Sequence, residues 1–342
     1  MELVTVAHGA GGEDTWRIVE RLIRSRVPPE LRKLGSGVGL DELDDGASIE
    51  GAERLVVTID SYTVSPLRFP GGSIGSLAAH GTINDLVVMG ARPAAFMDSI
   101  VVEEGMDMEE VEDLVNDFVE VLKRYRIALI GGDFKVMPRG SLSGMIITVV
   151  GLGVAKRIIV DRVREGDRIV VTGPIAEHGA TILAAQMGML DRAPELRSDT
   201  KPLIDTVLPV IEEFAQHIHA ARDATRGGLA AVLNEWVRGT ELAIVVDRSS
   251  IPIRREVESF LDMLGIDPLT VACEGVAVLA VDPSVAEDVV EELRRRGEAR
   301  ARIVGEVVKP RTPVARGRVL ARTEAGGLAF VEARALNLPR IC

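Results

Sequence analysis

Four aspartate-containing segments hold the residues whose chemistry is easiest to name. They read LDDGAS, TIDSY, TINDL and IGGDFK, and they contain Asp44, Asp45, Asp60, Asp85 and Asp133. Each Asp is expected at the end of an element or in a turn, where sites are built. Carboxylate oxygens are ligands of Mg²⁺, which bridges them to nucleotide phosphates. The alternative is that these residues cap helices and turns, and spacing alone favours it.

Two glycine-rich stretches are the next candidates, because small residues let backbone N–H groups approach phosphate oxygens. They read HGAGG, from His8 to Gly12, and FPGGSIG, from Phe69 to Gly75. Neither matches the P-loop pattern, and each taken alone is more often a turn. His8, Gly11 and Gly12 are the candidates from the first stretch.

The segment DATRGGL holds four candidates at the start of a predicted helix: Asp223, Thr225 and Arg226 precede it, and Gly227 lies in its first turn. Arg226 could pair with a phosphate group or with a carboxylate. A buried structural ion pair is the alternative, and the residues leave both open.

Only two cysteines are present, Cys273 and Cys342. Cys342 is the last residue and follows Pro339, which disfavours a helix and favours an extended arm. A thiol on such an arm can be loaded at one active site and inserted into another. An incidental terminal cysteine is the alternative that stays open. Cys273 precedes an apolar strand and is predicted to be a small core residue.

The apolar pattern predicts an α/β (α+β) chain. In the first half, strands are expected at 54–59, 94–102 and 143–154, and helices at 73–89 and 107–125. Asp107 and Glu110 have the capping-box offset at the start of the second helix.

A second set of elements begins near Asp167. The expected elements are a strand over RIVVTG, helices at 176–188 and 202–219, a helix over RGGLAAVLNEWVRG, a strand over LAIVVD, a helix at 252–264, a strand over GVAVLAV, a helix at 283–296 and a strand over RIVGEVV. The charged stretch Lys156–Glu165 is the expected linker. We therefore predict domains at 1–156 and 157–322, followed by a flexible tail at 323–342.

Composition narrows the class of protein. The 342 residues carry a formal charge of -12, with scattered Lys and Arg, so nucleic-acid binding is not expected. The two cysteines form no disulfide framework, and the N-terminus lacks the order of a signal peptide. No apolar run reaches the roughly 18 residues of a spanning helix. We expect a cytoplasmic protein that does not interact with a membrane.

Taken together, eight segments resemble the HypE family of hydrogenase maturation factors: HGAGG, DDGA, TIDSYTVSPLRFPGGSIG, GTINDLVVMGA, GGDFKV, RDATRGGL, CEGVAV and the terminal PRIC. They match in order from His8 to Cys342. HypE belongs to a wider family of ATP-using enzymes that includes aminoimidazole ribonucleotide synthetase, thiamine monophosphate kinase and selenophosphate synthetase. The PRIC end separates HypE from these relatives. The resemblance implies a two-domain PurM-like fold with mixed sheets, helices packed on them and an extended C-terminal tail.

The resemblance also implies a homodimer whose N-terminal domains pair through their strands, with ATP and Mg²⁺ bound near that interface. The implied metal or phosphate residues are Asp44, Asp45, Asp60, Asp85 and Asp133, with Asn84 as a neighbour. The implied nucleotide-binding residues further include His8, Gly11, Gly12, Asp223, Thr225, Arg226 and Gly227.

The reaction implied by the resemblance takes place on Cys342. The partner carbamoyltransferase HypF loads a carbamoyl group, and ATP activates the carboxamide oxygen. Loss of phosphate then leaves a thiocyanate, and the cyanide is delivered to the iron of [NiFe]-hydrogenase on a HypC–HypD complex. Two protons must leave the nitrogen, so a base is needed, and Glu274 and Lys135 are the candidates. Lys135 could instead orient the amide or neutralise phosphate charge.

Two residues depart from the family pattern, and two other functions compete with the one that the resemblance implies. Phe134 stands where the family commonly has Thr, and Gly46 where it has Ala or another small residue. A kinase or synthetase of a free small molecule is one competing function, although selenophosphate synthetase would place a reactive Cys near the N-terminus. A non-enzymatic carrier is another, and it would leave the Asp and Gly segments unexplained.

Overall fold

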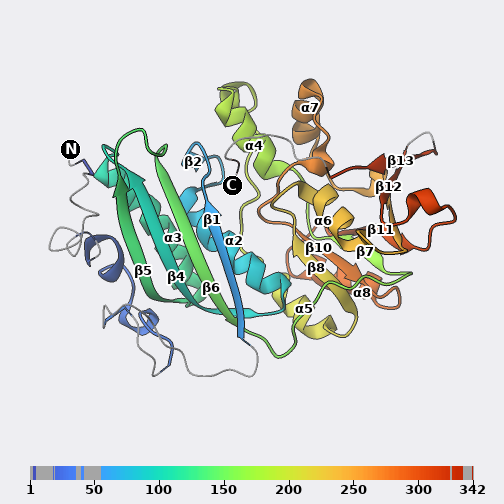
Figure 1. Cartoon of the computed structure of the whole chain (residues 1–342), viewed down its shortest axis with the longest axis horizontal. Helices are drawn as coiled ribbons and strands as arrows, with labels where there is room; N and C mark the ends of the chain where they lie inside the picture. Colours follow the sequence, from blue (N-terminus) through green and yellow to red (C-terminus); the bar gives the residue numbers. More distant parts are fainter. Residues whose placement is uncertain are drawn as a thin grey trace. The chain divides into compact units, whose positions relative to one another are not determined.

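The computed structural model describes residues 3–4, 18, 20–35, 40–41, 55–323, 326–333 and 341. The chain forms two compact units, which Figure 1 shows in sequence colours. Unit 1 is built from Met1–Leu86 and Arg92–Lys156, and unit 2 from Val87–Ala91 and Arg157–Ile341. None of the helices in the described part of the chain has both the length and the apolar character that a membrane crossing needs.

Unit 1 is organised around a four-stranded sheet with the order β1-β6-β4-β5. The strands are β1 (Leu55–Tyr62), β4 (Arg92–Glu103), β5 (Ala128–Met137) and β6 (Met145–Val154). β6 is antiparallel to β1 and to β4, whereas β4 and β5 are parallel. A short ribbon of β2 (Arg68–Phe69) and β3 (Gly72–Ser73) precedes the first long helix.

The helices α2 (Ile74–Val88) and α3 (Met108–Tyr125) cover one face of this sheet (Figure 1). Along β6, every second residue is buried and the residues between them are more exposed, as expected for a sheet with one packed face. Asp107 caps α3 as predicted, because its side chain accepts the backbone N–H of Glu109 at 3.0 Å.

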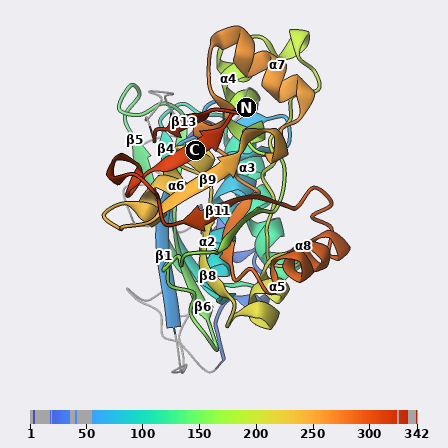
Figure 2. The ribbon, with the colours of Figure 1, turned by 90° about the vertical axis from the view of Figure 1, so that its right-hand side faces the viewer.

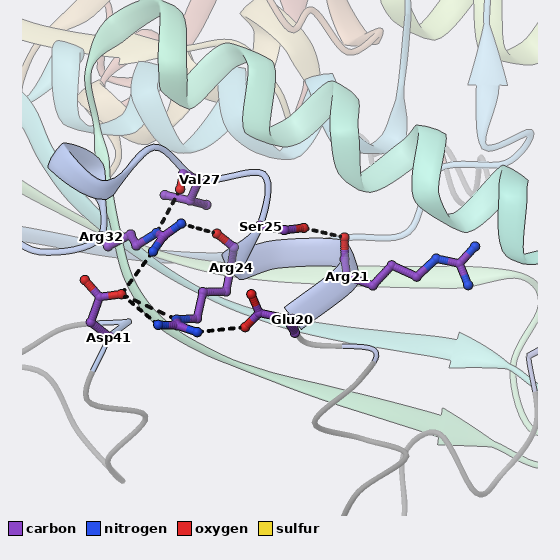
Figure 3. Close-up of polar contacts among 7 residues, drawn as sticks. All are labelled: Glu20, Arg21, Arg24, Ser25, Val27, Arg32 and Asp41. Atoms are coloured by element: carbon purple, nitrogen blue, oxygen red, sulfur yellow. Dashed lines mark hydrogen bonds and ion pairs between the residues drawn. The ribbon is translucent and has the colours of Figure 1, made fainter.

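Two arginines hold together the segment before the sheet (Figure 3). Its short helical turns are η2 (Glu20–Arg24) and η3 (Pro29–Leu31). Arg32 donates to the carbonyl oxygen of Arg24 at 2.8 Å and to the Asp41 carboxylate at 3.1 Å. Arg24 also donates to Glu20, at 2.9 Å. The hydrogen bond from Arg32 lowers the pKa of Asp41, so this carboxylate stays charged near neutral pH.

Unit 2 contains a seven-stranded sheet with the order β13-β12-β9-β11-β7-β10-β8. The strands are β7 (Arg168–Val171), β8 (Ile218–Asp223), β9 (Ala243–Asp247), β10 (Ala277–Val281), β11 (Arg302–Val308), β12 (Val319–Arg322) and β13 (Leu328–Val331). The β12 and β9 pair is parallel and the other pairs are antiparallel. β13 lies within the segment predicted as a tail and adds an edge strand to the sheet.

Helices cover both faces of this second sheet, since all five residues of β10 are buried. The helices are α4 (Glu177–Gln186), α5 (Leu208–Phe214), α6 (Gly228–Val237), α7 (Arg255–Leu264) and α8 (Ala286–Arg295). Shorter turns are η4 (Leu190–Arg192), η5 (Arg248–Ser250), η6 (Pro268–Thr270) and η7 (Pro313–Ala315). One core cluster joins the sheet to α4, α6 and α7. The helices α5 and α8 lie side by side, and α8 contacts β7 and β11 (Figure 2).

Three of the predicted aspartates lie in other parts of their elements than the sequence predicted. Asp60 lies within β1, Asp85 within α2 and Asp133 in the middle of β5, so the prediction of turns and element ends was wrong for them. Gly131 and Gly132, which precede Asp133, also belong to the strand, where they pair with Met97 and Asp98 of β4. A Cβ at Gly132 would come 1.8 Å from Oδ1 of Asp98, so this strand position requires glycine.

The helix predicted at 202–219 is also shorter than expected, since α5 ends at Phe214 and Ile218 begins β8. Ile218 and Ala220 are buried next to β10, and strand pairing outweighs the helical spacing of this stretch.

Candidate active site

The predicted metal residues of unit 1 are spread across its sheet. Asp60 pairs with Val149, Val149 with Asp98, and Asp98 with Gly132, so these four residues form one row. Strands lie about 4.8 Å apart, which separates Asp60 from Gly132 by about 14 Å along the sheet. Asp133 follows Gly132 and points to the opposite face. Asp60 and Asp133 of one chain therefore cannot bind the same magnesium ion, whose ligands lie about 2 Å away.

Asp60 and Asp85 are better placed relative to each other. The hydroxyl of Thr58 donates to Oδ2 of Asp85 on α2 at 2.7 Å, so Thr58 points to the helix-covered face of β1. Asp60 follows Thr58 by two positions and points to the same face. Asn84, next to Asp85 on α2, is fully buried. Both carboxylates thus belong to the layer between sheet and helix.

Asp133 and Lys135 form a pair on β5. Nζ of Lys135 lies 3.2 Å from Oδ2 of Asp133, with 58% of the Asp133 side chain and 59% of the Lys135 side chain exposed. An ion pair this exposed contributes little to stability, so both groups are available to a ligand.

No three His, Cys, Asp or Glu side chains gather into a metal site within the part of the chain that the structure describes. Six predicted site residues lie outside that part: His8, Gly11, Gly12, Asp44, Asp45 and Cys342. Asp60 and Asp85 supply only oxygen donors, which suit a hard cation such as Mg²⁺. The magnesium site remains a prediction in which these two residues need further ligands.

In unit 2, the DATRGG segment runs from the end of β8 to the start of α6. Asp223 is the last residue of β8, and Gly227 is the N-cap of α6. A Cβ at Gly228 would come 2.4 Å from the carbonyl oxygen of Val271, so the glycine lets α6 pack against the loop after η6. Arg226 is exposed, which excludes the buried ion pair considered above. It lines a cavity of about 440 Å³ together with Asn234, Gly227, Ala231, Glu235, Arg238, Gly317 and Ala333.

Glu274 lies in the loop between η6 and β10, and its residue is 2% exposed. The Asp199 carboxylate accepts the backbone N–H of Glu274 at 3.1 Å and that of Gly275 at 2.9 Å. Burial raises the pKa of Asp199 despite these hydrogen bonds. The loop that carries the predicted base is therefore fixed by a second acid. Cys273, beside it, is a core residue as predicted, and burial raises the pKa of its thiol.

A third acid belongs to the same region. Glu177 begins α4, and Nη1 of Arg254 lies 3.0 Å from its Oε1. Burial, reinforced by the charge of Asp199, raises the pKa of Glu177 to about 6. A carboxyl group that titrates near neutral pH can both accept and donate a proton.

The end of the described chain is bound in unit 2. Ile341 is 8% exposed, and its carbonyl oxygen lies 2.7 Å from Nε2 of His178. Nδ1 of His178 lies 2.7 Å from the Ser198 hydroxyl, and Ser198 directly precedes Asp199. The residue that precedes Cys342 is thus tied to a polar network that continues to the Glu274 loop.

Sequence reasoning missed Glu177, His178, Ser198 and Asp199. The signal was the pair of polar dipeptides EH and SD, each beside an apolar stretch. Such dipeptides are common, and only the fold brings these two together.

The sequence and fold of each unit define a class of protein. Residues 43–155 match the N-terminal domain, and residues 164–317 the C-terminal domain, of AIR synthase related protein. Carbamoyl dehydratase HypE of Rhodobacter capsulatus is 37% identical over 100% of this chain and 98% of its own length. The chain belongs to the HypE family of hydrogenase maturation proteins, which confirms the resemblance and the fold class.

Solved structures agree with this assignment. A crystal structure of hydrogenase maturation protein HypE in complex with ATP superposes with a TM-score of 0.90 at 34% identity, covering 98% of this chain and 99% of that one. HypE in a HypE–HypF complex gives a TM-score of 0.76 at 31% identity, covering 81% of this chain and 90% of that one.

Proposed function

We propose that this chain is an ATP-dependent carbamoyl dehydratase that converts an S-carbamoyl group on Cys342 to a thiocyanate. The observation that carries the proposal is the binding of Ile341 by His178, because Cys342 follows Ile341 directly in the chain. The name of the R. capsulatus relative and the ATP complex of a HypE structure support the reaction class and the nucleotide.

The reaction balances with ATP as the second substrate. The group S–C(=O)–NH₂ loses its oxygen to the γ-phosphoryl group and two protons from its nitrogen, which leaves S–C≡N. The products are the thiocyanate, ADP and phosphate, and the S–C bond is kept. An amide oxygen is a poor leaving group, and its phosphorylation makes it a good one.

Glu274 is the proposed base for the protons on nitrogen. Its carboxylate is buried, and its backbone is held by Asp199. A group in such a fixed position can accept a proton without first being ordered. Lys135, exposed on β5 beside Asp133, is the second candidate and could instead orient the amide or neutralise phosphate charge.

Each unit by itself contributes candidate residues for binding a nucleotide or magnesium. In unit 1, Asp60 and Asp85 share the layer between β1 and α2, and Asn84 is the buried neighbour of Asp85 on that helix. In unit 2, the exposed guanidinium of Arg226 can form a bidentate pair with phosphate oxygens.

A homodimer is proposed from the exposed face of β1. This strand lies at the edge of its sheet, and its alternate residues Leu55, Val57 and Ile59 are 42%, 57% and 66% exposed. An exposed apolar edge invites pairing, and a second copy of the chain offers the same stripe. HypF is the proposed carbamoyl donor, since a HypE–HypF complex is known, and a HypC–HypD complex is the proposed acceptor of the cyanide. The reaction needs a free thiol at Cys342, which a reducing cytoplasm maintains.

The test is intact mass spectrometry of the chain incubated with magnesium, ATP, carbamoyl phosphate and a HypF carbamoyltransferase. We expect a gain of one carbamoyl group followed by loss of one water, and neither change in Cys342→Ala. If ATP is hydrolysed with no change in protein mass, the substrate is a free small molecule and the proposal fails.

A further inference from the structure

A buried histidine binds the end of the described chain. His178 is fully buried in the first turn of α4, and its partner Ile341 is 163 positions away in sequence. A histidine that served only the core of unit 2 could use an acceptor from a neighbouring element. The acceptor here belongs to the segment that ends in Cys342.

The donor and acceptor in each hydrogen bond around His178 can be assigned. The Ile341 carbonyl can only accept, so Nε2 carries the hydrogen. Burial lowers the pKa of His178 to about 4, and the ring is therefore neutral at pH 7. Nδ1 must then accept, and the Ser198 hydroxyl donates to it. Ser198 Oγ in turn accepts the backbone N–H of Thr200 at 3.1 Å. The relay selects the tautomer that can bind Ile341.

Hydrogen bonds donated by backbone N–H groups on both sides of His178 connect it to the loop that carries the proposed base, Glu274. The N–H of Ala176 donates to Sγ of Cys273 at 3.1 Å, and the N–H of Gly179 to the carbonyl oxygen of Ala272 at 3.0 Å. These bonds tie both sides of His178 to the residues that directly precede Glu274. The Ile341 carbonyl is thus held by the same framework that holds the Glu274 loop.

We propose that His178 is a positioning residue that docks the Cys342-bearing end of the chain through the Ile341 carbonyl, and that Ser198 sets its tautomer. The proposal rests on the proposed function, because docking matters for a reaction at Cys342. His178 touches neither the carbamoyl group nor the nucleotide in this role. It fixes the last backbone group before the reactive residue.

The experiment uses the full chain and measures how well its C-terminal end is docked, in the absence of ATP and of a carbamoyl group. Carboxypeptidase Y trims the C-terminus, and intact mass follows the loss of Ile341, which is buried when docked. His178→Phe keeps an aromatic ring and removes the donor, whereas His178→Gln keeps an N–H donor. A net hydrogen bond of about 0.5–1.5 kcal/mol predicts a roughly two- to tenfold faster loss of Ile341 in His178→Phe. We expect His178→Gln to remain near the wild-type rate.

Alkylation of Cys273 is the internal control for folding, because this thiol is fully buried. An unchanged rate of Ile341 loss in His178→Phe, with Cys273 protected, overturns the docking role. If Cys273 of His178→Phe reacts, the variant is misfolded and Ser198→Ala replaces it in the test. An unchanged rate of Ile341 loss in Ser198→Ala, with Cys273 protected, also overturns the docking role.

Single-turnover dehydration of the preloaded chain then tests positioning. We expect the rate to fall in His178→Phe, by an amount set by the fraction of chains that remain docked, and to recover in His178→Gln. Faster trimming with an unchanged dehydration rate would show docking without positioning and reject the proposal. Absence of dehydration in the wild type would reject the proposed function instead, while the trimming result still reports on docking.

Discussion

The Asp199 carboxylate accepts the backbone N–H of Glu274 at 3.1 Å, so one acid fixes the backbone of another. Asp199→Ala removes this acceptor and also leaves the N–H of Gly275 without its partner. We expect a loss of about 1–3 kcal/mol in the free energy of unfolding. Asp199→Asn keeps one acceptor oxygen and should lose less. Calorimetry of both variants checks this, with the exposed Asp205→Ala as control. A wild-type melting temperature for Asp199→Ala would show that these bonds are dispensable.

The base assignment predicts a kinetic defect without a folding defect. Glu274→Gln keeps the size of the side chain and removes its ability to take a proton. The rate of single-turnover dehydration of preloaded chain should fall by at least about 100-fold. Glu177→Gln is the informative comparison, because burial raises the pKa of Glu177 to about 6. If Glu274→Gln retains the wild-type rate and Glu177→Gln does not, the base is Glu177.

Asp98 predicts a pH dependence of stability in unit 1. Its two carboxylate oxygens are buried without a hydrogen-bond partner among the described residues. Burial raises its pKa from 3.8 to about 7. The folded chain therefore binds this proton more tightly than the unfolded chain does. The stabilisation is fully present below about pH 4 and is lost as the pH rises through about 7, by at most about 4 kcal/mol.

Asp98→Asn should abolish that loss. We expect the wild type to lose more stability than the variant between pH 5 and pH 8, as measured by calorimetry. Asp113→Asn is the matched control, since the Asp113 side chain is 76% exposed. Parallel curves for the wild type and Asp98→Asn would contradict the raised pKa.

Gly132→Ala predicts a steric conflict with the same carboxylate. The new Cβ would come 1.8 Å from Asp98 Oδ1, whereas a Cβ at Gly131 would meet only the flexible end of Met97 at 3.1 Å. Overpacking of this kind costs about 1–3 kcal/mol, so Gly132→Ala should be clearly less stable than Gly131→Ala. The conflict should be relieved in the double variant with Asp98→Ala, which a thermodynamic cycle measures. Additive effects would rule out the contact.

The exposed stripe on β1 predicts the oligomeric state. Ile59→Asp places a charge at the most exposed apolar position of that strand, 66% exposed. We expect sedimentation to give the mass of a dimer for the wild type and of a monomer for the variant. Met263→Asp, at a position 61% exposed on α7, should remain dimeric. A monomeric wild type would remove the basis for the proposed dimer.

The sequence predicted most of the elements, because α3 and β6 have clear helical and alternating patterns. It failed at β5 and β8, whose strands depend on neighbours distant in sequence. Gly132 pairs with Asp98 of β4, and Ile218 pairs with Val281 of β10. The DATRGG segment suggested Arg226 through its glycines and charged residues, and the resemblance of CEGVAV to the HypE family suggested Glu274; the roles of both residues stay predictions. The relay from Ser198 to Ile341 could not be predicted, because it joins residues with no common local pattern.

The burial of β10 on both faces also affects the order in which parts of unit 2 unfold. Every residue of this strand is buried, and the strand pairs with β7 on one side and β8 on the other. Its amide hydrogens should exchange with solvent only when the whole unit unfolds. The Glu274 loop leads directly into this strand. The proposed base is thus attached to the slowest-exchanging part of unit 2, and brief local openings elsewhere in the unit leave it in place.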